Sequence, residues 1–213
     1  MEITSINGPC FKVITNEAVL FTDPSFASQD TLSNISSITA VTFSVPTENR
    51  NDYTGLPGNP KIIQGPGEYE ISSIYIRGLG TPDKSPDEVN QINTIYLIQT
   101  EGLIICHLGH LTTIPTNRDI EELSGIDVLF VPIEGHGLIT PKEAAELTNS
   151  ISPDMVIPMA YEKNGLNKTY QDALTSFSKD IGVKELDSRS KLTLNKSAVT
   201  SETQLIVLEP LES

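Results

Sequence analysis

The stretch that decides the fold is Asp127-Val128-Leu129-Phe130-Val131-Pro132 together with the later Thr140-Pro141-Lys142-Glu143. A short apolar run of this kind, rich in branched and aromatic residues, predicts a buried strand. Thr140 can cap a helix, Pro141 suits the first helical turn, and Glu143 completes a capping box. A second apolar run at Met155–Met159 predicts the next strand. The second half of the chain is therefore expected to alternate helices and strands.

Outside this stretch, short apolar runs separated by turn residues predict strands through the first half of the chain. Helices are expected over 116–123, 140–151 and 170–181, with Gly182 as the C-terminal cap of the last. The polar stretch Thr81–Asn90 is expected in a surface loop. Two sheets packed face to face with helices outside accommodate this pattern in a single domain of residues 1–213. The expected strands are 2–6, 10–15, 18–21, 38–43, 61–64, 68–71, 74–77, 93–99, 103–108, 127–133, 155–159, 192–194 and 204–208.

The composition limits the class of partner. The formal net charge is −14, which repels nucleic acid and anionic membranes. We find neither a secretory signal pattern nor an apolar run long enough to span a bilayer in the sequence, so a cytoplasmic protein is expected. Cys10 and Cys106 lie in apolar runs, which predicts reduced, buried thiols rather than a disulfide framework.

Six phrases occur in a recognisable order and spacing. They are Val41-Thr42-Phe43-Ser44, Gly65-Pro66-Gly67-Glu68-Tyr69-Glu70-Ile71, Asn93-Thr94-Ile95-Tyr96-Leu97-Ile98, Cys106-His107-Leu108-Gly109, Asp127–Pro132, and Glu143-Ala144-Ala145-Glu146-Leu147 with Val156-Ile157-Pro158-Met159. Together they resemble the metallo-β-lactamase superfamily, and in particular its small metal-dependent hydrolases related to ascorbate-6-phosphate lactonase. The resemblance implies a four-layer αββα sandwich of the α/β (α+β) class, with a zinc site at the edge where strand ends converge.

The same resemblance implies that the metal ligands are missing. The family signature Ser-His-x-His-x-Asp-His is replaced here by Ser44-Val45-Pro46-Thr47-Glu48-Asn49-Arg50. The family's Gly-His near the N-terminus is Asn7-Gly8, and its middle histidine falls near Asp83. A zinc site needs three or four donor side chains for each ion, so neither zinc nor any other cofactor is expected. The lost ligand positions are Val45, Thr47, Asn49, Arg50, His110 and Ala160.

Some polar side chains remain where the resemblance places the old metal site. His107, within an apolar strand, is expected to be a structural histidine in or near the core. The expected vestigial pocket consists of Arg50, His110, Glu134, His136 and Tyr161. Two roles stay open for Arg50. It is either a solvent-exposed loop arginine without a fixed partner, or its guanidinium stands close to the lost zinc charge and pairs with acidic groups.

Three functions stay open on this evidence. The first is a non-catalytic binding or assembly module of the cytoplasm, without catalytic residues, whose partner is an unidentified small molecule or protein. Homo-oligomers are compatible with this reading. The second is a metal-dependent hydrolase with a reduced site rebuilt around His110, His136 and Glu134. The third is a metal-independent enzyme that uses the vestigial pocket.

Overall fold

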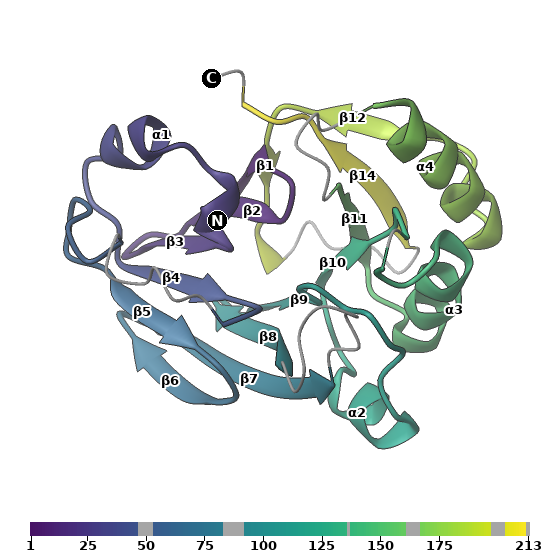
Figure 1. Cartoon of the computed structure of the whole chain (residues 1–213), viewed down its shortest axis with the longest axis horizontal. Helices are drawn as coiled ribbons and strands as arrows, with labels where there is room; N and C mark the ends of the chain where they lie inside the picture. Colours follow the sequence, from purple (N-terminus) through teal and green to yellow (C-terminus); the bar gives the residue numbers. More distant parts are fainter. Residues whose placement is uncertain (47–52, 83–91, 136, 161–166, 197–202, 212–213) are drawn as a thin grey trace.

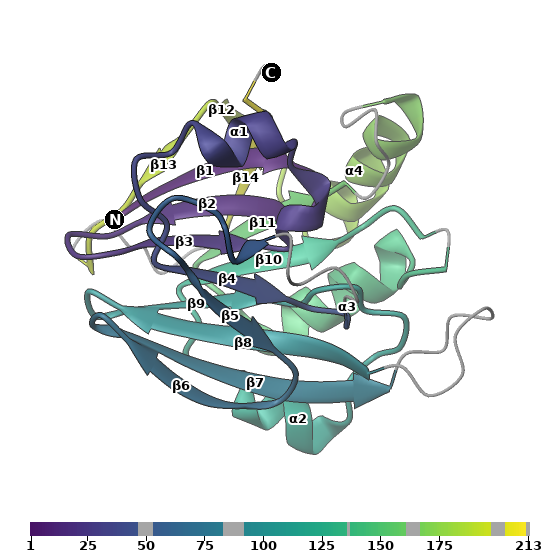
Figure 2. The same ribbon diagram turned by 60° about the vertical axis from the view of Figure 1, so that its left-hand side comes forward.

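The computed structural model describes residues 1–46, 53–82, 92–135, 137–160, 167–196 and 203–211. Two β-sheets pack face to face, and helices cover their outer faces (Figure 1). Figure 2 shows the same stack of layers after a rotation. The αββα sandwich expected from the sequence is confirmed.

The first sheet has six strands in the order β13-β1-β2-β3-β4-β5. β1, β2 and β3 pair antiparallel, whereas β3, β4 and β5 run parallel. The carboxyl ends of β3, β4 and β5 therefore lie at one edge of this sheet. The bounds are β1 Glu2–Asn7, β2 Cys10–Ile14, β3 Val19–Thr22, β4 Ala40–Phe43, β5 Lys61–Gln64 and β13 Leu192–Thr193.

The second sheet has eight strands in the order β12-β14-β11-β10-β9-β8-β7-β6. Strands β6 to β9 form an antiparallel meander, while β9, β10, β11, β14 and β12 run parallel. The bounds are β6 Gly67–Ile71, β7 Ile74–Pro82, β8 Ile92–Thr100, β9 Leu103–His107, β10 Val128–Pro132, β11 Met155–Met159, β12 Asp187–Arg189 and β14 Gln204–Leu208.

Helices α2 (Asn117–Glu122), α3 (Pro141–Ile151) and α4 (Lys168–Asp180) lie outside the second sheet. Apolar side chains of α3 and α4 share one buried cluster with the outer faces of β10, β11 and β14. The capping box predicted for α3 is present, because Thr140 and Glu143 bond each other's backbone N–H.

The main core lies between the two sheets, where Phe11 of β2 stacks on Phe130 of β10 with ring centroids 4.2 Å apart. Both cysteines are free and buried, which confirms the prediction that they are reduced core residues. Of the helices in the described residues, none has the length and apolar character needed to cross a lipid bilayer.

The structure adds three short elements and extends one strand into an expected loop. The 3₁₀ helix η1 (Pro24–Phe26), helix α1 (Gln29–Ser33) and strand β12 were not expected, because each is too short or too polar to give a periodic pattern. The expectation that Thr81–Asn90 forms a loop is wrong at its start. β7 continues to Pro82, and Thr81 is buried there, where its hydroxyl oxygen accepts a 3.0 Å hydrogen bond from the Asn93 amide. Residues 83–90 of that stretch lie outside the described residues.

Candidate functional site

The strand ends of both sheets meet at one place. Asp23 follows β3 and Ser44 follows β4 in the first sheet, while Gly109 and His110 follow β9 in the second. The two sheets are joined there by a 2.7 Å hydrogen bond from Thr94 N–H to the carbonyl of Ser44. This is the edge where the sequence places the candidate site.

Asp23 is the buried anchor of this edge. One carboxylate oxygen accepts the backbone N–H of Ser44 at 2.7 Å, and the other accepts the Ser44 hydroxyl at 2.7 Å. Only 4 % of Asp23 is exposed, and its burial raises the pKa of the carboxyl group. The electrostatic interactions with His107 and His110 and the hydrogen bonds from Ser44 lower this pKa, but by less than burial raises it. The carboxylate thus fixes Ser44, the first residue of the stretch that the family resemblance aligns with the metal-binding signature.

His107 is a core residue, as predicted. Its Nε2 lies 3.0 Å from the carbonyl oxygen of Pro9, and its ring packs against Phe11 and Phe130. A carbonyl can only accept, so Nε2 carries the proton. Burial lowers the pKa of His107, which favours the neutral ring, and Nδ1 lies 3.9 Å from a carboxylate oxygen of Asp23. The side chain therefore links the β1–β2 turn to the strand ends.

Gly109 and Asn93 pack beside Ser44 at the buried side of the site. The Asn93 amide donates 3.0 Å hydrogen bonds to Thr81 and to the carbonyl of Leu108. Gly109 has φ +65°, and a β-carbon at this position would lie 2.4 Å from the β-carbon of Ser44 and 2.5 Å from the Asn93 side-chain oxygen. Only glycine fits here, so the chain after β9 lies directly on Ser44.

The turn Asn7-Gly8 lies against the end of β11. Gly8 has φ +56°, and a β-carbon there would lie 2.9 Å from the carbonyl oxygen of Ala160 and 3.0 Å from the ring of Phe26. Asn7 donates a 3.1 Å hydrogen bond to the carbonyl of Phe26. Two positions that the family resemblance assigns to the metal site, Gly8 and Ala160, are thus neighbours through backbone atoms.

Four of the predicted site positions, Val45, His110, Glu134 and Ala160, lie among the described residues. Val45 follows Ser44 and is half-buried, while Ala160 is 7 % exposed; neither side chain has a metal-donor atom. His110 is half-buried, and its electrostatic interaction with Asp23 lowers the pKa of that carboxyl group. Glu134 follows β10 and is buried. Burial raises the pKa of Tyr170 on α4, and the nearby Glu134 raises it further. Thr47, Asn49, Arg50, Asp83, His136 and Tyr161 lie outside the described residues.

Sequence reasoning missed the residues that organise this edge. Asp23, Asn93 and Ser44 are buried polar side chains, and only Ser44 stood next to a predicted ligand position. An aspartate directly after an apolar strand was the available signal for Asp23. Among the described residues, His, Cys, Asp and Glu side chains nowhere gather in a group of three that could hold a metal ion.

Comparison with known proteins places the chain in a family. A family model described as a β-lactamase superfamily domain matches residues 2–160. A curated UPF0173 metal-dependent hydrolase of Thermococcus onnurineus is 32 % identical over 108 residues, which is 49 % of this chain and 48 % of the relative. A Thermococcus kodakarensis relative of the same name is 32 % identical over 98 residues, 45 % of this chain and 44 % of the relative. The chain spans about half the length of the curated relatives it matches.

Solved structures agree over almost the whole length. A Thermotoga maritima protein named as a Zn-dependent hydrolase of the metallo-β-lactamase superfamily has a TM-score of 0.77, with 26 % identity and 99 % of both chains covered. A metallo hydrolase of Ignicoccus hospitalis has a TM-score of 0.68, with 99 % of this chain and 96 % of that chain covered, and at 17 % identity it shows the shared fold. Since the family model covers most of the chain and the strand order forms the same sandwich, this protein belongs to the metallo-β-lactamase superfamily.

Proposed function

We propose that this protein is a non-catalytic member of the metallo-β-lactamase superfamily, which uses the fold as a binding or assembly module. The observation that carries the proposal is the pair Val45 and Ala160. Each follows a strand that ends at the candidate site, and the family resemblance assigns both positions to metal ligands. Aliphatic side chains offer zinc no donor atom, and a missing ligand at each of two separate strand ends leaves a metal ion poorly held.

Two polar side chains near these positions take part in contacts between strand ends. Asp23 accepts two hydrogen bonds from Ser44, and the Nε2–H of His107 is directed to the carbonyl of Pro9. These contacts join β3 to β4 and β9 to the turn before β2. They support a structural role for this edge, and we assign no reaction step to a metal.

One alternative keeps a specific basis. His110 acts on the charge of Asp23, Glu134 is buried after the neighbouring strand β10, and the relatives are named metal-dependent hydrolases. A reduced site built on His110 and Glu134, with His136 outside the described residues, would return hydrolytic chemistry to the fold. Metal content decides between the two functions.

The test is elemental analysis of purified, tag-free protein after dialysis against zinc, manganese and iron. We expect well below about 0.2 metal ions per chain, because too few donors converge. A reproducible ratio near one would overturn the proposal. His110→Ala then identifies the rebuilt site, since it would abolish such binding, whereas Asp172→Ala on the exposed face of α4 would leave it intact.

A second measurement asks whether a metal supports the fold. Structural zinc ions contribute directly to folding, so removing them lowers the unfolding temperature. We expect EDTA to leave the unfolding temperature of this protein unchanged. A drop of several degrees that added zinc reverses would contradict the proposal.

A further inference from the structure

Strand β12 forms the free edge of the eight-stranded sheet. It pairs in parallel with β14 on one side, and in the described residues no strand pairs with its other side (Figure 1). The carbonyl of Arg189 accepts the N–H of Glu209, which follows β14, at 2.9 Å. Because backbone groups alternate along a strand, the N–H and C=O of Ser188 point away from β14 toward the open edge.

Along this edge, acidic residues precede Ser188 and basic residues follow it. The segment reads Glu185-Leu186-Asp187-Ser188-Arg189-Ser190-Lys191, with two acidic residues before Ser188 and two basic residues after it. All seven are exposed except the half-exposed Asp187. In an antiparallel pair of identical strands centred on Ser188, Asp187 stands opposite Arg189 of the second copy, and Glu185 opposite its Lys191. Parallel pairing in register would place like charges together.

We propose that β12 is a self-association edge, at which a second copy of this chain adds its own β12 antiparallel and joins two eight-stranded sheets. The two Ser188 residues would form a hydrogen-bonded pair through their outward N–H and C=O groups. Asp187 and Arg189 would then occupy the adjacent non-hydrogen-bonded pairs, where cross-strand side chains are closest. Such an interface is isologous, and its two-fold symmetry supplies every charge pair twice.

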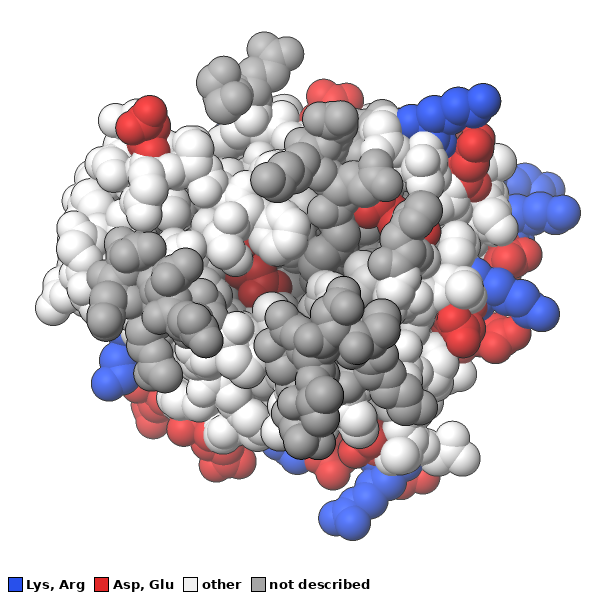
Figure 3. Space-filling view, in the orientation of Figure 1, with Lys and Arg blue, Asp and Glu red and all other residues white. Residues whose placement is uncertain are grey.

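The charge distribution leaves this side of the molecule accessible to a like-charged copy. Residues 163–213 carry seven basic and seven acidic side chains, so the formal charge of −14 lies within residues 1–162. Figure 3 shows Lys and Arg side chains interspersed with Asp and Glu side chains along the side of the molecule that carries α3 and α4. Repulsion between exposed charges is screened within about 10 Å at ordinary salt, so the local balance at the edge governs close approach.

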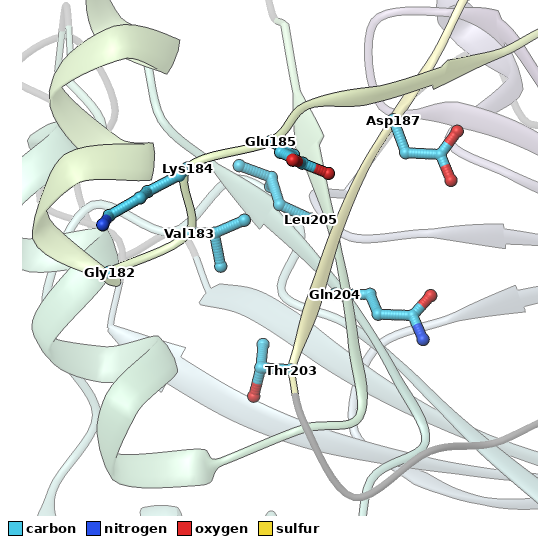
Figure 4. A pocket seen from close by; sticks show the side chains of 8 residues that line it. All are labelled: Gly182, Val183, Lys184, Glu185, Asp187, Thr203, Gln204 and Leu205. Atoms are coloured by element: carbon cyan, nitrogen blue, oxygen red, sulfur yellow. The ribbon is translucent and has the colours of Figure 1, made fainter.

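Apolar surface lies beside the edge. Leu186, directly before β12, is 48 % exposed. A hollow of about 520 Å³ separates the segment Gly182–Glu185 from the start of β14 at Thr203–Leu205 (Figure 4). In the proposed pairing Leu186 stands opposite Ser190 of the second copy, so the dimer would cover it.

Three of the four charged side chains of the edge form ion pairs within the monomer. Arg189 contacts Asp187, and Lys191 lies 2.8 Å from Glu2. Short edge strands with charges also occur as protection against aggregation, and a protected edge predicts a monomer at every concentration. Association through β12 instead replaces these ion pairs within one chain with acidic–basic pairs between the two copies. It also adds backbone hydrogen bonds between the strands.

The experiment is sedimentation velocity of the full chain from about 10 μM to about 1 mM, a range that brackets weak association. We expect wild type to form dimers as concentration rises. Asp187→Arg places two arginines opposite each other, and Arg189→Asp places two aspartates opposite each other, so each variant alone should associate at least about tenfold more weakly. An equal mixture of the two variants restores opposite charges across the interface and should form heterodimers.

Two controls keep the result interpretable. The double variant Asp187→Arg with Arg189→Asp retains the intrachain pair and the self-complementary order, so it should dimerise like wild type even if a single variant folds poorly. Asp172→Arg, an exposed change on α4, should also leave dimerisation intact. The proposal is overturned if wild type stays monomeric across the range, if the single variants dimerise like wild type, or if their mixture remains monomeric.

Discussion

Replacing Asp23 tests whether its carboxylate holds the candidate site together through hydrogen-bond geometry. Asp23→Ala removes the acceptors of two 2.7 Å bonds and leaves the N–H and the hydroxyl of Ser44 without them. A buried polar group deprived of its partner costs about 1–3 kcal/mol. Part of this cost is recovered because a buried charge disappears. We therefore expect Asp23→Ala to lower the free energy of unfolding by about 2–4 kcal/mol.

Asp23→Asn is the matched comparison, because its amide has the same shape. The amide oxygen can still accept the N–H of Ser44, and the amide nitrogen can donate to the Ser44 hydroxyl. We expect a loss of no more than about 1 kcal/mol. Urea unfolding followed by circular dichroism measures both values, and Asp172→Ala on the exposed face of α4 controls for loss of an aspartate alone. Equal destabilisation by Asn and Ala, or a loss below about 0.5 kcal/mol for Ala, would refute the reasoning.

The pH dependence of the same variants gives an independent check. Burial raises the pKa of Asp23 in the folded state above its unfolded value. The folded state therefore holds the Asp23 proton more tightly than the unfolded state does, which stabilises the fold. This contribution to the free energy of unfolding is fully present below the unfolded pKa, at about 4, and is lost as pH rises through the folded pKa. Asp23→Asn cannot titrate. We expect its stability relative to wild type to improve as pH rises from about 4 toward neutrality.

Three further predictions address other parts of the fold. Gly109→Ala should lower the free energy of unfolding by about 3 kcal/mol or more, because it adds a steric clash to left-handed backbone strain. Gly125 has φ +75° and open space around it, so Gly125→Ala should cost only about 1–2 kcal/mol. Urea unfolding midpoints compare the two variants. Thr140→Ala removes the N-cap of α3 and should cost about 1 kcal/mol in thermal unfolding, and no loss would mean that the cap contributes nothing. Burial raises the pKa of both thiols, so Cys10 and Cys106 should react with a thiol reagent only after denaturation, and rapid reaction of the native protein would contradict their burial.

The elements that the sequence predicts well are those whose signals are local. The capping box at Thr140 and the apolar run before it lie within a few residues of each other, and both α3 and β10 form where expected. Strand β12 shows the opposite case. Its residues Asp187–Arg189 carry no apolar side chain, and they form a strand because β14 offers a neighbouring edge.

The candidate site was harder to predict because its contacts join distant parts of the chain. His107 contacts Pro9 across 98 positions, and Asp23 contacts Ser44 across 21. Periodicity and spacing carry no information on such pairs. The family resemblance directed attention to ligand positions and therefore to Val45 and Ala160, while the buried side chains that position them have no place in a ligand signature.

The anchors and the proposed ligand losses are separate properties of the same edge. Asp23, His107 and Gly109 act by contacts with Ser44 and Pro9 inside the protein. On the proposed function, these contacts would hold the described strand ends in place when donor side chains are replaced. On the proposed function, this separation explains how apolar side chains came to stand at Val45 and Ala160 while the strand ends around them stayed in place.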